Sequence, residues 1–214
     1  MRRRWGAARF RLPGALELRA YHEAGHAVAA LLQGFSIARV SIARRGGFGG
    51  ACVFRRGGRP GPGRAGALAR PNRRGLGRIA RAAATVALAG SVAQDAHALH
   101  HGFVALDLRT GLPFPLFSAG AEADARNGWR AARVLSGRAG AQRAFLAEVR
   151  TTTERLLGSR EAWSAVRALA RALLRDRTVQ GAQAERIIHA ALRDGARAPR
   201  RGARRRAGRG GRSR

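Results

Sequence analysis

Residues 15–33, with the sequence ALELRAYHEAGHAVAALLQ, combine a helical apolar pattern with two histidines and a glutamate. Leu18, Tyr21, Val28 and Leu31 recur at helical spacing, and Gly34 stands where the carboxyl cap of a helix is expected. The pattern predicts a helix over 15–33. Because a helix fixes the directions of its side chains, this segment decides where the residues that can do chemistry will point.

His22, Glu23 and His26 form the sequence HEAGH, an instance of the HExxH pattern. Four residues is close to one helical turn, so both imidazoles leave the same face and can bind one Zn²⁺. Glu23 then lies beside the ion, placed to take a proton from the water that zinc activates. The alternative is a helix with two surface histidines and an incidental acid.

A catalytic zinc site needs a third protein ligand and leaves one position for water. The residues downstream of the helix offer carboxylates and further imidazoles, and their chemistry alone does not choose among them. The candidates are Asp95, Asp107, Glu122, Asp124, His97, His100 and His101.

The rest of the chain reads as mainly helical. Alternating β-branched residues at 37–42 and the segment 51–54 predict two short strands on either side of a glycine-rich turn at 46–50. Further helical patterns run from Leu76 or Ile79 to about Leu99, and then over 121–135, 139–157, 161–174 and 181–192. We therefore expect a mainly α domain of the α+β class, with a small β-strand pair beside the HExxH helix.

All 42 basic residues are arginines, and 23 of them lie in three stretches without any acid, residues 1–14, 55–81 and 195–214. These stretches predict a basic N-terminal segment at 1–14, an Arg/Gly/Pro-rich loop at 55–74 and a disordered arginine-rich tail at 195–214. The folded domain is then expected over 15–194. Outside the three stretches, 19 arginines stand against 12 acids, a balance of +7 that a folded domain tolerates.

The absence of lysine excludes a Walker A phosphate loop and a Schiff-base lysine. The single cysteine, Cys52, excludes an intramolecular disulfide framework. The longest apolar stretch, residues 82–93, is shorter than the roughly 20 residues that a transmembrane helix needs. We expect no transmembrane segment and a cytoplasmic location, with any membrane association peripheral.

Four blocks of the sequence, in order, resemble the peptidase domain of FtsH-type zinc metalloproteases. They are AYHEAGHAVAALLQG with VSIARRGGFGG, then ATVALAGSVAQD, then SAGAEADARNGWRAARVL, and finally ERLLGSREAWSAVRALARALLRDRTVQGAQAERII. The resemblance covers about 18–192. It implies a zincin-like fold and a zinc metalloendopeptidase that cleaves unfolded or flexible polypeptides.

By this resemblance the third zinc ligand is Asp124, Glu23 is the catalytic base, and Asp95 and Glu122 are supporting or surface acids. The base takes a proton from water and returns it to the leaving amine. The strand at 37–42 is a hypothetical site for edge pairing with an extended substrate. The sequence departs from the family at Arg44, Gln94 and Asp95, and it contains no ATPase motif.

Two other functions stay open at this point. The chain can be a catalytically inactive or partner-dependent scaffold that works with a separate ATPase or as a homo-oligomer. Alternatively, its arginine-rich segments can bind nucleic acid or another anionic surface, since neutralising phosphates releases counterions. Few aromatic residues lie between those arginines, so nonspecific, salt-sensitive adhesion is favoured over specific nucleic-acid recognition.

Overall fold

The structure, a computed structural model, describes residues 13–43, 50–56, 73–100 and 121–197. These residues are mainly helical and include a small antiparallel sheet, as the sequence predicts. The elements are α1 (Ala15–Leu32), β1 (Phe35–Ser41), β2 (Ala51–Arg56), α2 (Arg73–His100), α3 (Ala121–Leu135), α4 (Ala139–Gly158), α5 (Arg160–Asp176), β3 (Thr178–Gln180) and α6 (Gly181–Arg197).

The first helix ends where the sequence predicts. Gly34 adopts a positive φ of 83°, which glycine tolerates without steric cost, and its amide donates to the carbonyl of Leu31 at 3.0 Å. The chain then turns directly into β1 at Phe35. The strand that follows the HEAGH helix is therefore folded back along it.

The sheet has three strands rather than the expected pair, in the order β2-β1-β3 and antiparallel throughout. The third strand, β3, was missed because it has only three residues and lies between two helices. Since β1 has a neighbour on each side, the prediction that its edge pairs with a substrate is wrong. Within the described residues, the free edge near the HEAGH helix belongs to β2.

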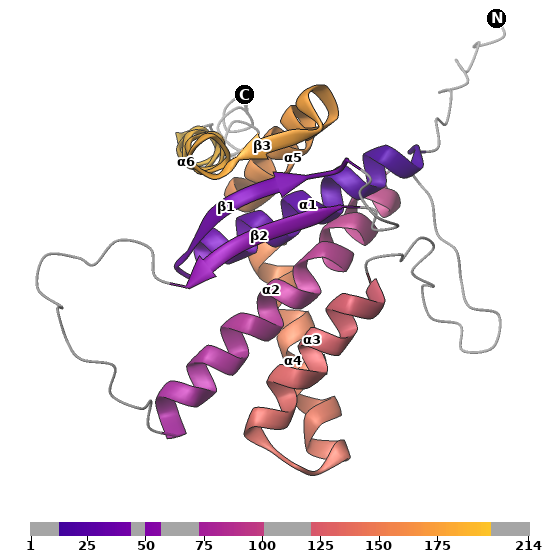
Figure 1. The fold of residues 1–214 in the computed structure, drawn as a ribbon, viewed down its shortest axis with the longest axis vertical. Helices are drawn as coiled ribbons and strands as arrows, with labels where there is room; N and C mark the ends of the chain where they lie inside the picture. Colours follow the sequence, from indigo (N-terminus) through magenta and orange to yellow (C-terminus); the bar gives the residue numbers. More distant parts are fainter. Residues whose placement is uncertain (1–12, 44–49, 57–72, 101–120, 198–214) are drawn as a thin grey trace, which may run out of the picture.

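Figure 1 shows α1 in the middle of the molecule, behind β1 and β2, with β3 and α6 above it and α2, α3 and α4 below. The principal core lies around α1 and joins it to the sheet, α2, α5 and α6. Val28, Val40, Val166 and Leu169 are completely buried in it. The helix that carries the two histidines is thus the central element of the fold.

The lower part of the molecule has a smaller core of its own. Ala80 and Ala84 of α2 pack there with Ala131 of α3 and Val149 of α4. Because α2 belongs to both cores, it connects the part around α1 to the α3–α4 pair. This connection places the beginning of α3 beside the HEAGH helix, where Asp124 meets His22 and His26.

One helix, α2, is long and apolar enough over Arg74–Leu99 to cross a membrane by length and composition. Half of its apolar window is buried inside the fold, where it contacts α1, α3 and α4. The core helix of a soluble protein passes the same test, so this is weak evidence for a membrane span.

The predicted basic segments fall mostly outside the described residues, namely at 1–12, 57–72 and 198–214. Where their ends are described, they are shorter than expected. Strand β2 continues through Arg56, α2 begins at Arg73, and α6 runs to Arg197. The helical domain therefore extends three residues beyond the expected boundary at 194.

Candidate metal centre

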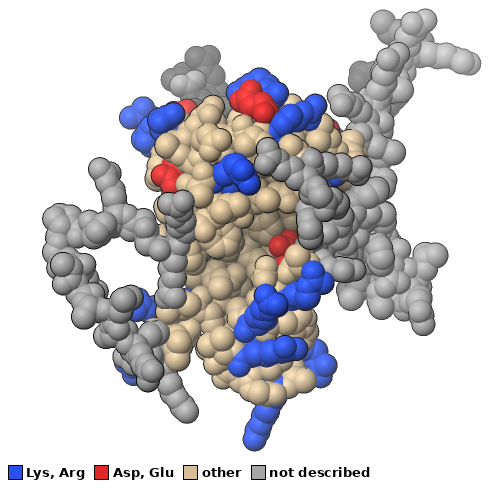
Figure 2. Space-filling view, viewed as in Figure 1, with Lys and Arg blue, Asp and Glu red and all other residues tan. Residues whose placement is uncertain are grey.

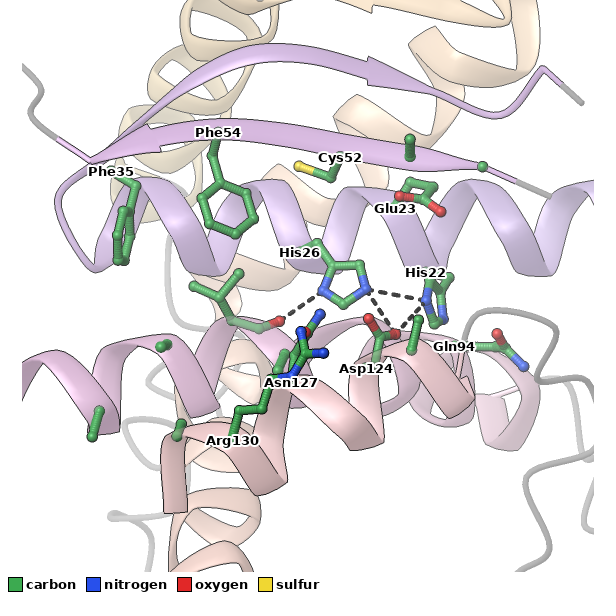
Figure 3. Close-up of a pocket in the computed structure, with 18 of the residues that line it drawn as sticks. His22, Glu23, His26, Phe35, Cys52, Phe54, Gln94, Asp124, Asn127 and Arg130 are labelled. Carbon is green, nitrogen blue, oxygen red and sulfur yellow. Dashed lines mark hydrogen bonds and ion pairs between the residues drawn. The ribbon is translucent and has the colours of Figure 1, made fainter. Parts of the chain in front are cut away.

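Three side chains from two helices converge on one point. The Nε2 atoms of His22 and His26 lie 3.1 Å apart, and Asp124 Oδ2 lies 2.9 Å from the first and 3.1 Å from the second. His22 and His26 come from successive turns of α1, and Asp124 comes from the first turn of α3 (Figure 3). Among the described residues, this group is the one that can hold a metal ion.

The hydrogen bond made by the Nδ1 atom of His26 determines which of its two ring nitrogens can bind a metal ion. Its Nδ1 lies 2.7 Å from the carbonyl oxygen of Val86 in α2 and donates a proton to it. In a neutral imidazole this leaves Nε2 as a lone-pair donor that faces the oxygen of Asp124. Two lone pairs at this distance repel unless a proton or a metal ion lies between them, so the arrangement suits a cation.

The spacing of the three atoms suits zinc. Tetrahedral bonds of about 2.0–2.1 Å place any two ligand atoms roughly 3.3 Å apart. The three separations here, 2.9, 3.1 and 3.1 Å, are shorter than this by only a few tenths of an ångström. Two imidazoles and one carboxylate can therefore bind the ion after a slight outward movement.

The charges of the site are strongly coupled. Burial would raise the pKa of Asp124, but hydrogen bonds from His22 and His26 outweigh it and lower that pKa to about 2. Burial likewise disfavours a charged His26, but the hydrogen bond and charge of Asp124, the charge of Glu23 and the bond to Val86 together outweigh burial and raise the pKa of His26. The metal-free site thus retains one negative carboxylate that attracts a cation.

Glu23 lies on the same helix as the ligands but outside their triangle, below β2 (Figure 3). Its side chain is buried, and this burial raises its pKa above the usual value. Gly50 makes room for it, because a Cβ atom at that position would lie 3.0 Å from Glu23 Cδ. A carboxylate in this position has the protonation chemistry of a general base.

Two glycines allow α1 and α2 to approach closely at the site. A Cβ atom on Gly25 would lie 2.6 Å from Ala93 Cβ, and one on Gly90 would overlap His26 Nε2 and lie 2.7 Å from His22 Nε2. Gly90 of α2 therefore lies directly against the Nε2 atoms of both histidines. Sequence reasoning missed Gly90, whose only signal was its place in the ALAGSVAQ segment.

The other candidate ligands are not brought to this point. Asp95 pairs with Arg150 at 3.1 Å, and His97 contacts Glu17 at 3.2 Å and stacks on Tyr21. Asp107 and His101 lie outside the described residues, as do the side chains of His100 and Glu122. Within the described part of the chain, Asp124 is the candidate that joins the two histidines of the HEAGH helix.

The three ligands line one part of a cleft of about 980 Å³. Figure 2 shows the hollow as a largely uncharged surface, with arginines gathered over the lower part of the molecule. Beyond the metal group, the walls come mainly from α1, β2, α2 and α3, and most of their side chains are small or apolar. The site is therefore open to a molecule much larger than water.

Comparison of the chain with models of known protein families and with curated proteins finds no match. The interpretation of the site consequently rests on its own geometry and chemistry.

Proposed function

We propose that this protein is a zinc-dependent metalloendopeptidase that hydrolyses peptide bonds of unfolded or flexible polypeptides. The observation that carries the proposal is the convergence of His22, His26 and Asp124 beside Glu23 in an open cleft. This donor set with an adjacent carboxylate supports metal-assisted hydrolysis.

Two histidines and one carboxylate also suit non-haem Fe²⁺. Glu23 favours zinc, because hydrolysis requires a base next to the metal and this buried carboxylate has no ligand role in the triangle. The wide cleft with a free strand edge further supports a polypeptide as the substrate.

When bound, zinc supplies Lewis acidity that polarises a carbonyl and activates water. His22, His26 and Asp124 would hold the ion, and the bond from His26 Nδ1 to Val86 keeps the ring oriented. Glu23 accepts the proton from water and delivers it to the leaving amine. Its neighbour Gly50 leaves the carboxylate the space to turn between these two partners.

The backbone of β2 would align the substrate, in place of β1. In the described sheet, β2 has one free edge, and its residues Gly50, Ala51 and Cys52 line the cleft next to the metal group. Pairing along this edge would hold an extended chain through its backbone and demand no folded shape from it. We therefore expect action on unfolded chains without nucleotide, in the cytoplasm or at a membrane surface.

The proposal is tested with purified protein loaded with one zinc ion and an unfolded fluorogenic protein as substrate, without nucleotide. Wild type is expected to cleave it, and Glu23→Gln is expected to retain zinc and lose cleavage by a factor of at least about 10². Glu148 lies on the surface of α4, so the same type of substitution there, Glu148→Gln, is the matched control and should leave cleavage unchanged.

Zinc content is measured on the same samples by mass spectrometry, with Fe²⁺ loading in parallel. Cleavage that survives in Glu23→Gln would contradict its role as the base, and activity with Fe²⁺ alone would contradict zinc. Zinc binding without cleavage would favour the scaffold that depends on a partner ATPase or on a second copy. Retention of the protein on nucleic acid that disappears with added salt would indicate nonspecific adhesion only.

A further inference from the structure

The cleft continues well beyond the metal group, and its far end is built from apolar side chains that remain exposed. Phe54 of β2 keeps 39 % of its surface accessible and Leu76 of α2 keeps 38 %. Phe35 and Phe54 meet edge to face, with ring centroids 5.4 Å apart. Large apolar side chains exposed together in a concave site mark a binding surface.

The opposite wall of this end is made of small residues. Helix α2 presents Ile79, Ala80 and Ala83 to the cleft at helical spacing, and α3 adds Ala131 and Val134. Alanine at these positions leaves open space that larger side chains would fill. The space lies between the aromatic pair and the two helices, and it connects directly to the metal group (Figure 3).

The position of Phe54 relates this space to the substrate backbone. Cys52 and Phe54 line the cleft, whereas Val53 between them does not, as alternation along a strand requires. Cys52 lies over His26 in Figure 3, so an extended peptide paired with β2 near Cys52 would place a side chain over Phe54 two residues further along. The apolar space is therefore within reach of residues next to the cleaved bond.

One charge lies at this end of the cleft. Arg130 of α3 is exposed and lines the cleft six residues after Asp124, and it forms no ion pair among the described residues. Its guanidinium is complementary to an acidic side chain or a terminal carboxylate of the bound peptide. The occupant that fits both features is an extended peptide with a large apolar residue and a nearby acid.

We propose that the space between Phe54, Ile79 and Ala83 is a specificity subsite that takes a large apolar side chain within two residues of the cleaved bond, with Arg130 favouring an acidic neighbour. The subsite rests on the proposed peptidase function and names its substrate preference. A space of this kind discriminates phenylalanine from serine by about tenfold or more.

The test uses quenched fluorescent peptides of twelve residues, made of Gly, Ala and Ser with one Phe, and mass spectrometry to locate the cleaved bond. Moving the Phe along the peptide should move the cleaved bond with it, to within two residues. Replacing Phe by Ser should lower kcat/KM at least about tenfold. Cleavage at positions independent of the Phe would overturn the proposal.

Three variants separate the subsite from the fold. Ala83→Phe fills the space from an exposed helical position and should bring the Phe-to-Ser ratio of kcat/KM close to one, as should Phe54→Ala. Val53→Ala is the matched control, since Val53 precedes Phe54 on β2 but does not line the cleft. Zinc content and the unfolding midpoint are measured for each, and an unchanged ratio in a folded Ala83→Phe would contradict the assignment.

A binding measurement keeps this inference distinct from the proposed function. Anisotropy of the labelled peptides with zinc-loaded Glu23→Gln should show tighter binding of the Phe peptide than the Ser peptide, and Ala83→Phe in that background should remove the difference. Adding Glu next to Phe should tighten binding, and Arg130→Ala should remove that gain. If the Phe peptide binds more tightly but no peptide is cleaved by the wild type, only the peptidase function is refuted. If the Phe and Ser peptides bind equally, the subsite is refuted.

Discussion

At the metal end of the cleft, α1 and α2 meet through glycine and alanine, whereas at the other end Phe54 and Leu76 stay half exposed. The metal end leaves no room for a side chain at Gly25 or Gly90, because an added Cβ atom would meet the facing helix or the histidine ligands. The apolar end has space to spare. Under the proposed function, this difference would let the metal end fix the geometry of the reaction while the apolar end adapts to the bound substrate.

The largest effect is expected from Gly90→Ala at the metal end. The new methyl group would overlap His26 Nε2 and crowd His22, so the histidines cannot hold the ion in their present positions. We expect zinc affinity to fall about 100-fold or more, measured by competition with a chromogenic chelator.

The matched control for this change is Gly128→Ala in α3. A Cβ atom there would lie 3.5 Å from Leu146 Cδ2, an ordinary contact, and alanine favours a helix by up to about 1 kcal/mol. Zinc affinity should be unchanged. Equal zinc affinity in Gly90→Ala and Gly128→Ala would contradict the close approach of α2 to the ligands.

A smaller effect, on folding rather than binding, is expected from Gly25→Ala. The added atom would lie 2.6 Å from Ala93 Cβ and would push α1 and α2 apart. Overpacking of this kind costs about 1–3 kcal/mol of unfolding free energy. Urea denaturation measures it, with Gly140→Ala as the control because its position has no neighbour within 4 Å; equal stability of the two variants would show that the helices are not tightly packed.

The metal end should also respond to pH when zinc is removed. Asp124, with its pKa lowered to about 2, stabilises the fold above its unfolded pKa of about 3.9, and this contribution is lost as pH falls towards 2. His26, whose pKa is raised, stabilises the fold below about 6.5, and its contribution is lost as pH rises through the folded value. The pair is therefore most stabilising between about pH 4 and 6.5.

Urea denaturation in the presence of a chelator, at pH 5.5 and pH 8, tests this window. At pH 5.5 the free energy of unfolding of the wild type should exceed that of Asp124→Asn by on the order of 1–2 kcal/mol. With zinc bound, the protein should instead be more stable at pH 8 than at pH 5.5, because protons compete with the metal for the histidines. The same pH dependence in wild type and Asp124→Asn would contradict the coupling.

The smallest effect is expected far from both ends, at the surface pair Arg81–Glu148. Its atoms lie 2.8 Å apart, but the side chains are 44 % and 60 % exposed, so solvent screens their attraction. Glu148→Gln should change the unfolding free energy by less than about 1 kcal/mol and leave zinc affinity unaffected. A larger loss would mean that the α2–α4 contact depends on this pair.

Much of the fold follows from periodicity, because the helices carry long apolar patterns. The boundaries of α3 agree with the sequence prediction, and α1 differs by one residue. Strand β3 could not be predicted, since three residues give no measurable alternation. Its existence depends on Arg177 in a left-handed conformation, which turns the chain after α5 and places Val179 opposite Val40.

The metal group was partly predictable for a similar reason. His22 and His26 are related by helical spacing, which a sequence displays directly. Asp124 is separated from His26 by nearly a hundred residues, so only the resemblance to a peptidase domain singled it out. Gly90 and Phe54 matter through contacts between elements, and no local pattern marks such contacts.

The central claim is that His22, His26 and Asp124 bind zinc, and X-ray absorption at the zinc edge tests it most directly. The account predicts two imidazole nitrogens and oxygen ligands at about 2.0–2.2 Å in the wild type, with one fewer imidazole in His26→Ala. Cys52 lines the same cleft, so its sulfur is the competing ligand that the spectrum would reveal. A sulfur ligand near 2.3 Å, or an unchanged spectrum in His26→Ala, would contradict the assignment.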